Sequence, residues 1–281
     1  MTKLVAIVGP TASGKTDLAI KVAEKFDGET ICADSRTIYK GMDIGTAKPT
    51  KEQQAAVPHH LLDIINPDET FSAAQFKAAA LEAIKDTELR GRLPIIVGGS
   101  GLYVYSVIYD YQFPAGADND ARQELNRMPI DQLVSKLQGL DPQAAAEIDL
   151  QNPRRVIRAI ETAGQPRAQS ELRADTVLVG LKLANDKLDE VIAQRTKAMI
   201  EAGLEGEVQQ LIKAGASEEV LRSPGYAEFA EASDIKEVQQ LINLHTRQLV
   251  KRQLTWFKRN KDIHWFDDPT AAYDYVSGEL Q

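Results

Sequence analysis

The sequence predicts an α/β protein built on a parallel sheet, and three observations lead to that class. Short apolar runs alternate with longer helical patterns through the first third of the chain. A glycine-rich segment, Gly9 to Thr16, joins the first apolar run to the first helical pattern. Further apolar runs with the length of buried strands return near residues 94 and 176. Strand, helix and strand at this spacing are typical of a parallel α/β sheet.

The individual elements follow from hydrophobic periodicity. The runs that predict buried strands are, in chain order, Leu4–Val8, Glu29–Ala33, Pro94–Val97 and Thr176–Leu181. Between the first two, Lys15–Phe26 has the apolar spacing of an amphipathic helix. Ser72 precedes Gln75 by three residues, which is a capping box, so a helix is expected from Ser72 to about Arg90. After Leu181 the chain reads as helical until His264–Phe266.

The character of the chain changes at Pro114, where strand-like runs stop. Asp118–Gly164 reads as several short helices with breaks at Pro129, at residues 139–142 and at Asn152-Pro153. We therefore predict an α/β core from residues 1–113 and 174–281, which includes a helical C-terminal part, and a helical insertion domain from residues 114–173. No repeat of 20 to 50 residues and no low-complexity tract is present, which excludes a solenoid.

Composition limits the functional classes. With 281 residues, 43% hydrophobic and 26% charged, the chain has the composition of a soluble globular protein of one or two units. The net charge of −8 argues against a surface that coats nucleic acid or anionic membrane as a whole, but leaves room for local basic patches. Cys32 is the single cysteine and cannot form an internal disulfide, which favours a reducing cytoplasm. No apolar run reaches membrane-spanning length, so we expect a cytoplasmic monomer with no membrane association.

The glycine-rich segment fits the P-loop pattern G-x-x-x-x-G-K-[ST] in full. It reads Gly9-Pro10-Thr11-Ala12-Ser13-Gly14-Lys15-Thr16 and lies between a predicted strand and a predicted helix, as the motif requires. In such loops the backbone N–H groups and the helix N-terminus surround a polyanion, the lysine adds a positive charge and the hydroxyl ligates Mg²⁺. The sequence therefore predicts a site for a di- or triphosphate, with Thr16 as a magnesium ligand.

Two polar residues follow the ends of other predicted strands. Asp34 comes directly after the strand that ends at Ala33, and Ser100 follows the strand that ends near Val97. Because the carboxyl ends of strands in an open α/β sheet face the ligand crevice, both should lie beside whatever the P-loop binds. A turn or helix-cap role remains open for each.

Several blocks of the sequence resemble one family in the family's own order. They are Gly9–Thr16, Asp34–Tyr39, Gly41–Pro49, Pro58–Asp63, Gly98–Tyr103, Asn152–Glu161, Gly225-Tyr226 and Thr246–Trp256. With these blocks, which extend over nearly the whole chain, the protein resembles the tRNA dimethylallyltransferases, also called tRNA isopentenyltransferases or IPP transferases.

The resemblance implies a P-loop NTPase-like core and a magnesium-dependent transfer of a dimethylallyl group. The donor would be dimethylallyl diphosphate, and the acceptor the exocyclic N6 of the adenosine beside the anticodon of a tRNA with an adenosine-rich anticodon loop. Asp34 matches the family's general base. Ser100 stands where the family usually has threonine, and with Lys15 it completes the expected catalytic set.

Departures from the family pattern concern mainly tRNA recognition. Asp34-Ser35-Arg36-Thr37 would read the flipped adenine, yet Thr37 stands where glutamine is usual. The residues around Gly225-Tyr226 also differ, and residues 114–140 look shorter than the family's insertion.

Arg195 follows from helical spacing as well as from the resemblance. On a predicted helix from Asp186 to Ala202, it falls into the same stripe as Leu188, Val191 and Met199. A charge on an apolar face needs an anion or a route along which the side chain reaches water. The anion would be either the diphosphate or a structural carboxylate. The family commonly has a second arginine where this chain has Val191.

Two basic elements could hold RNA on an otherwise acidic protein. Between His245 and Lys261 there is no acidic residue, and one arc of the predicted helix carries Arg247, Lys251, Arg252, Lys258 and Arg259. The opposite, apolar arc should dock this helix, with Thr246, Leu249, Val250, Leu254, Trp256 and Phe257. The insertion contributes a second group, Arg154, Arg155, Arg158, Arg167 and Arg173. We expect phosphate contacts from both, with Gly225 and Tyr226 also near the RNA; a solvated face, a membrane surface or a protein partner stays open for each.

Two other functions remain possible on the residues alone. A P-loop small-molecule kinase would bind ATP and use Asp34 to activate a hydroxyl, but it leaves the basic elements without a role. A nucleotide-gated interaction protein would use its helical half as a partner surface. Adjacent His59 and His60 suggest a metal pair, but we favour a structural role because neighbouring side chains point in different directions.

Overall fold

The computed structural model describes residues 3–113, 119–163 and 171–281. They fall into two compact units, one made of residues 1–110 and 171–281 and the other of residues 111–170. The expected boundaries, 114 and 173, lie three residues further along the chain in each case. Arg167 lies outside the described residues, and Arg173 belongs to the larger unit, where it pairs with Glu88 at 2.9 Å.

The larger unit confirms the α/β class with a six-stranded, all-parallel sheet of order β3-β2-β4-β1-β5-β6. The strands are β1 (Leu4–Val8), β2 (Gly28–Cys32), β3 (His59–His60), β4 (Leu93–Gly98), β5 (Thr176–Leu181) and β6 (His264–Phe266). Both ends of each of the four central strands, β1, β2, β4 and β5, lie within one residue of the prediction. The near-continuous apolar sequences of β1 and β4 are fully buried, as strands covered on both faces require.

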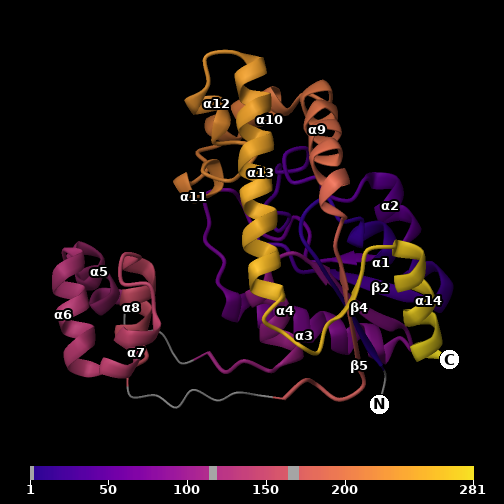
Figure 1. Cartoon of the computed structure of the whole chain (residues 1–281), viewed down its shortest axis with the longest axis horizontal. Helices are drawn as coiled ribbons and strands as arrows, with labels where there is room; N and C mark the ends of the chain where they lie inside the picture. The colour runs from indigo at the N-terminus through magenta and orange to yellow at the C-terminus, as the bar shows by residue number, and fades with distance from the viewer. Residues whose placement is uncertain (1–2, 114–118, 164–170) are drawn as a thin grey trace. The chain divides into compact units, whose positions relative to one another are not determined.

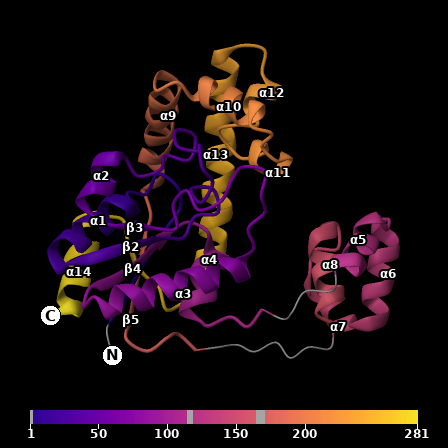
Figure 2. The same cartoon turned by 180° about the vertical axis from the view of Figure 1, so that it is seen from behind.

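Helices cover both faces of this sheet (Figures 1 and 2). The helices α1 (Lys15–Phe26) and α14 (Pro269–Leu280) pack on one face, where Val5, Ile95 and Val179 belong to one buried cluster. On the other face lie α3 (Ala73–Leu89) and α4 (Gly101–Ile108). The predicted capping box is confirmed, because Ser72 Oγ accepts from the N–H of Gln75 and Gln75 Oε1 accepts from that of Ser72.

A second buried cluster joins the loop after β2 to the helices of the C-terminal part. These are α9 (Asn185–Glu201), α10 (Leu204–Lys213), α11 (Glu218–Leu221), α12 (Glu228–Glu231) and α13 (Ile235–Phe257). Met42 and Tyr226 are among its fully buried side chains. Figures 1 and 2 show α9 and α13 side by side. This cluster fixes the loop after β2, which also contains α2 (Lys51–Ala56), against the helices.

The edge strand β3 was not predicted, and its histidines have structural partners. His60 Nε2 lies 2.6 Å from the buried carboxylate of Glu29, which also pairs with Arg90 and Arg92. Burial alone would raise the pKa of Glu29, but the hydrogen bonds from Arg90, His60 and Arg92 hold it at about 2. Among the described residues, no group of three or more His, Cys, Asp or Glu side chains could hold a metal ion.

The smaller unit contains only helices in its described part. They are α5 (Asn119–Arg127), α6 (Ile130–Leu140), α7 (Pro142–Glu147) and α8 (Pro153–Glu161). The breaks between them fall at the predicted prolines, because Pro142 and Pro153 each occupy a first helical position behind the capping side chains of Asp141 and Asn152. Leu133, Leu137 and Val156 lie in its core. Over the described residues of both units, no helix has the length and apolar character needed to cross a membrane.

Candidate active site

The P-loop, Asp34 and Ser100 come together because their strands end at one edge of the sheet. Val8 is paired with Gly98, and Cys32 with Val97, so the residues that follow β1, β2 and β4 emerge side by side. The Ser100 hydroxyl accepts a hydrogen bond of 3.0 Å from the N–H of Ser35. Sequence position alone had predicted this neighbourhood of the three segments.

The P-loop has the backbone that an anion site requires. Gly14 caps α1 in the left-handed region, at φ 81°, and the first N–H groups of that helix have no side-chain cap among the described residues. A Cβ on Gly9 would lie 2.3 Å from the carbonyl oxygen of Leu181, so only glycine fits there. The open N–H groups and the helix N-terminus therefore face the hollow beside the loop.

Two cations lie at this loop. Lys15 Nζ donates to the Pro10 carbonyl at 3.0 Å. Burial lowers the pKa of Lys15 to about 8; Asp34 opposes that shift and Arg195 adds to it. Arg195 extends from α9 and donates to Thr11 Oγ1 at 2.8 Å and to the Thr46 carbonyl at 3.3 Å. Within the described residues Arg195 has no carboxylate partner at ion-pair distance. Of the two anions expected for it, this favours the diphosphate over a structural carboxylate.

Two hollows meet at Arg195. One, the P-loop hollow, has a volume of about 450 Å³ and is lined by Ala12 to Asp17, Ala47, Gln53, Leu183, Val191, Arg195 and Pro269. The other, which we call the central cavity, has a volume of about 310 Å³. Its polar lining includes Thr11, Asp34, Ser35, Arg36, Ser100, Arg195, Arg252 and Gln253. Diphosphate binding in the first hollow would therefore place the rest of a donor molecule towards Asp34 and Ser100.

Asp34 and its neighbours are oriented by local bonds. Asp34 Oδ1 accepts from the N–H of Arg36 at 2.8 Å, and Arg36 in turn donates to the carbonyl of Glu219 at 3.3 Å. The carboxylate of Asp34 forms no ion pair with any described residue and lines the central cavity. Thr37, which was expected to read a base, is 7% exposed, and its hydroxyl has no hydrogen-bond partner among the described residues.

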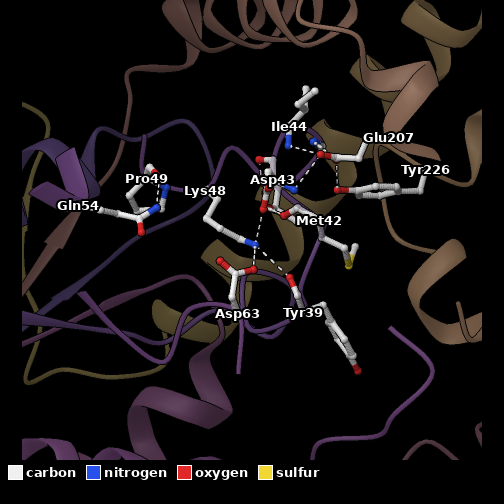
Figure 3. Close-up of polar contacts among 12 residues, drawn as sticks. Tyr39, Met42, Asp43, Ile44, Lys48, Pro49, Gln54, Asp63, Glu207 and Tyr226 are labelled. Carbon is white, nitrogen blue, oxygen red and sulfur yellow. Dashed lines mark hydrogen bonds and ion pairs between the residues drawn. The ribbon is translucent and has the colours of Figure 1, made fainter. Parts of the chain in front are cut away.

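A buried carboxylate, Glu207, organises the loop that supplies the Thr46 carbonyl (Figure 3). It accepts hydrogen bonds of 2.8 to 3.0 Å from the N–H groups of Asp43, Ile44 and Gly45 and from the Tyr226 hydroxyl. Lys48, also buried, donates to Asp43 at 2.6 Å, to Asp63 at 2.5 Å and to the carbonyl of Tyr39 at 3.0 Å. Glu207 thus holds the loop against α10, while Lys48 ties parts of the loop to one another and to Asp63.

The predicted RNA contacts at Gly225 and Tyr226 stay predictions, although both residues line the central cavity. Tyr226 is 2% exposed, and burial and Glu207 raise the pKa of its hydroxyl. Its ring lies against Gly45, where a Cβ would come within 2.5 Å of the ring. The Gly225 N–H donates to Glu228 at 2.8 Å.

The basic helix is α13, and it differs from the prediction at its C-terminal end. It ends at Phe257, so Lys258 and Arg259 follow the helix rather than belong to it. Val250 and Phe257 are buried as expected, whereas Trp256 is 40% exposed. Arg247 pairs with Asp189 at 2.6 Å, while Lys251 and Arg252 are exposed and form no ion pair with any described residue.

In the smaller unit, α8 carries the other predicted RNA contacts. Arg154 and Arg155 are exposed, and Arg158 donates to Glu161 at 3.1 Å. The assignment of Arg154, Arg155 and Arg158 to RNA stays a prediction.

Sequence reasoning missed Gln253 and Glu207. Gln253 Oε1 accepts from the N–H of Thr11 at 2.8 Å, and its Nε2 donates to the Gly99 carbonyl at 3.1 Å. Both partners are far away along the chain, so no local pattern points to these contacts. For Gln253 the sequence gave one signal, its place in the family block Thr246–Trp256. For Glu207 it gave none.

The fold and this edge of the sheet define an α/β protein with a P-loop motif, a carboxylate that forms no ion pair with any described residue, and a cavity lined by Thr11 of the loop and by that carboxylate, Asp34. Comparison with known proteins identifies the family within this class. The family model described as IPP transferase matches residues 37–260. The chain belongs to that family.

Relatives with this family's name are similar in sequence along nearly the whole chain. A tRNA dimethylallyltransferase of an Exiguobacterium species is 44% identical, over 97% of this chain and 93% of that protein. The corresponding protein of Anoxybacillus flavithermus is 42% identical, over 94% and 90%. A solved structure of a full-length tRNA isopentenylpyrophosphate transferase from Bacillus halodurans is similar with a TM-score of 0.75 and 38% identity, covering 100% of this chain and 97% of that one.

Proposed function

We propose that the protein is a transferase that moves a dimethylallyl group from dimethylallyl diphosphate to the exocyclic N6 of the adenosine beside the anticodon of tRNA, and releases diphosphate. The single observation that supports this most directly is the continuity of the site. The P-loop hollow and the central cavity share Arg195, so a donor's diphosphate and a base beside Asp34 fit at adjoining places.

The donor end suits the departure of a diphosphate. Breaking the allylic C–O bond leaves negative charge on the diphosphate and positive charge spread over the allyl group. The N–H groups of the P-loop, Lys15 and Arg195 are fixed where that negative charge would grow, and fixed dipoles and charges stabilise such a transition state.

The acceptor end suits an amine that needs to lose a proton. An exocyclic adenine amine is a weak nucleophile, and a carboxylate within hydrogen-bond reach makes it stronger by accepting its proton. Asp34 is the carboxylate that faces the central cavity without an ion-pair partner among the described residues. The Ser100 hydroxyl is held beside it through the Ser35 N–H.

The residues present fit a magnesium ion bound together with the diphosphate. The Thr16 hydroxyl lines the P-loop hollow and makes no hydrogen bond with any described residue. One hard oxygen ligand, completed by phosphate oxygens and waters, is a common arrangement for Mg²⁺. When bound, the ion would neutralise charge that develops on the leaving diphosphate.

RNA would be held by the exposed basic residues of α13, among them Lys251 and Arg252, of which Arg252 lines the central cavity, and by the arginines of α8. Phosphate contacts of this kind position an RNA while a single base is splayed into a pocket. A small-molecule kinase gives these basic surfaces no role, and the relatives are not named as kinases. We expect a monomer in the cytoplasm.

The test is transfer of label. The protein is incubated with Mg²⁺, labelled dimethylallyl diphosphate and unmodified tRNA whose anticodon-adjacent adenosine is followed by two more adenosines. Label should appear in the RNA and depend on that adenosine. Unlabelled RNA, together with phosphate transfer from ATP to a small acceptor, would overturn the proposal in favour of a kinase.

A further inference from the structure

Gln253 on α13 forms a bridge between two loops of the active site. Its side-chain oxygen accepts the N–H of Thr11 in the P-loop at 2.8 Å. Its side-chain nitrogen donates to the carbonyl of Gly99, the residue before Ser100, at 3.1 Å. The amide group supplies both an acceptor oxygen and a donor nitrogen at this position.

We propose that Gln253 is a positioning residue, which rests on the function proposed above. It holds the P-loop and the turn that carries Ser100 at a fixed separation, and it ties both to the helix that offers Lys251 and Arg252 to RNA. Through it, the donor and the RNA base are aligned for transfer, without Gln253 itself reacting.

Each partner of Gln253, itself or through the next residue, is linked to a group of the active site by a further hydrogen bond. The Thr11 N–H is engaged by Gln253, while the Thr11 hydroxyl accepts from Arg195. On the other side, Ser100 follows Gly99 directly and accepts from the N–H of Ser35, next to Asp34. A shift of Gln253 would therefore reach the cation at the diphosphate site and the carboxylate at the acceptor site.

Helix α13 packs closely on the glycine-rich turn that follows β4, residues 99–101. A Cβ on Gly99 would lie 2.4 Å from Gln253 Nε2, and one on Gly101 would lie 2.2 Å from the Trp256 ring. The two glycines thus admit two side chains of α13, three residues apart on the helix. The helix is seated on the turn at two points, which fixes its position along the turn as well as its distance from it.

Two exposed basic residues lie on α13 directly beside Gln253. Lys251 and Arg252 immediately precede Gln253, and Arg252 lines the same central cavity. An RNA phosphate held by these two side chains is bound to the same turn of helix that holds the P-loop. Binding of RNA and alignment of the donor therefore share one rigid element.

The experiment compares Gln253→Ala with Gly99→Ala and with the double variant. Gln253→Ala removes both hydrogen bonds, and Gly99→Ala places a methyl where the amide nitrogen lies. The matched control is Gln248→Ala, because Gln248 is an exposed amide on the same helix. For each variant, kcat at saturating donor and tRNA, tRNA affinity, inorganic diphosphate affinity and the thermal midpoint are measured.

Each single variant should lower kcat by about 10- to 100-fold, the usual effect of a misplacement near 1 Å. Affinities for tRNA and diphosphate should stay within about 3-fold, because the binding groups remain. In the Gln253→Ala background, Gly99→Ala should add less than about 3-fold, since the contact at 2.4 Å is then gone and the nearest remaining atom is the Gly9 carbonyl oxygen at 3.2 Å. Gln248→Ala should match the wild type.

Two results would overturn the inference. One is a kcat for Gln253→Ala within about 3-fold of the wild type. The other is a loss of activity that follows the loss of folded protein or of tRNA affinity, with normal kcat at saturation, which would make Gln253 a packing residue. If the wild type itself transfers no label to RNA, the proposed function fails instead, so the two failures are distinguishable.

Discussion

The guanidinium of Arg195 donates a hydrogen bond of 2.8 Å to the hydroxyl of Thr11, which connects α9 to the P-loop. Burial lowers the pKa of Arg195 and the nearby Asp34 raises it. Its hydrogen-bond acceptors among the described residues are uncharged. A charge in this position is poorly compensated until an anion arrives, so Arg195 should contribute strongly to diphosphate affinity.

Arg195→Gln should weaken inorganic diphosphate binding by about 10- to 100-fold, the usual worth of a charge-assisted hydrogen bond. Isothermal calorimetry at one pH and salt concentration measures this. Lys197→Gln is the control, because Lys197 is an exposed cation on the same helix, 3.8 Å from Glu201. Equal affinities for the two variants would exclude Arg195 from the diphosphate site.

Diphosphate affinity should depend on pH through Lys15. Since burial lowers the pKa of Lys15 to about 8, its amine is charged below that pH and loses its charge as the pH rises through it. Affinity should therefore fall between about pH 7 and pH 9, although inorganic diphosphate itself gains negative charge over that range. Lys15→Arg stays charged and should not show the fall. A parallel fall in Lys15→Arg would assign the dependence to another group.

Asp34→Ala should lower kcat by about 10²- to 10⁴-fold, the usual contribution of a general base. The affinity for tRNA, measured by filter binding, should stay within a few-fold, because the basic residues of α13 are untouched. Weaker RNA binding with a normal rate at saturation would give Asp34 a recognition role instead. Asp63→Ala is the control, because Asp63 pairs with Lys48 and does not line the central cavity. Its kcat should fall much less than that of Asp34→Ala.

Lys251 and Arg252 should control the salt dependence of RNA binding. Replacing both with alanine removes two exposed cations that have no ion-pair partner in the described part of the chain. The slope of log affinity against log salt should become shallower by about 0.7 to 0.9 for each RNA phosphate that these side chains neutralise. Lys236→Ala, an exposed cation at the other end of α13, should leave the slope unchanged. An unchanged slope in the double variant would remove this part of α13 from the RNA interface.

The sequence predicts those parts of the site that depend on strand ends. Gly9 to Thr16, Asp34 and Ser100 each follow a run of buried apolar residues, and parallel pairing brings such ends together. The two-residue strand β3 escapes detection because its sequence is only His59-His60, with no apolar alternation, and its partner Glu29 lies in another strand.

Contacts between distant segments are the part that the sequence could not predict. Gln253 is one of several glutamines on α13, and nothing in the local sequence distinguishes it from a solvated side chain such as that of Gln248. Glu207 likewise has the spacing of an ordinary acidic residue in the first turn of α10, yet it is buried. Both depend on the packing of the C-terminal helices against loops that precede them by more than 150 residues.

Glu207 provides the final prediction, because its two oxygens serve four donors. Oε2 accepts from Asp43 and Ile44, and Oε1 from Gly45 and the Tyr226 hydroxyl. In Glu207→Gln one oxygen becomes an NH₂ group, so two buried donors must face another donor. Leaving such donors unsatisfied costs about 1 to 3 kcal/mol each, so we expect the free energy of unfolding to fall by about 2 to 6 kcal/mol.

Tyr226→Phe removes one donor and leaves the carboxylate with three, so its cost should be smaller, about 1 kcal/mol. Urea unfolding followed by tryptophan fluorescence measures both, because Trp256 and Trp265 lie in the unit that contains the P-loop. Glu205→Gln, an exposed acid in the same turn of α10, is the control and should match the wild type. Glu207→Gln should also weaken diphosphate binding, since the Thr46 carbonyl that holds Arg195 follows the segment bound by Glu207. Unfolding curves that coincide for Glu207→Gln and Glu205→Gln would show that this buried carboxylate does not hold the loop.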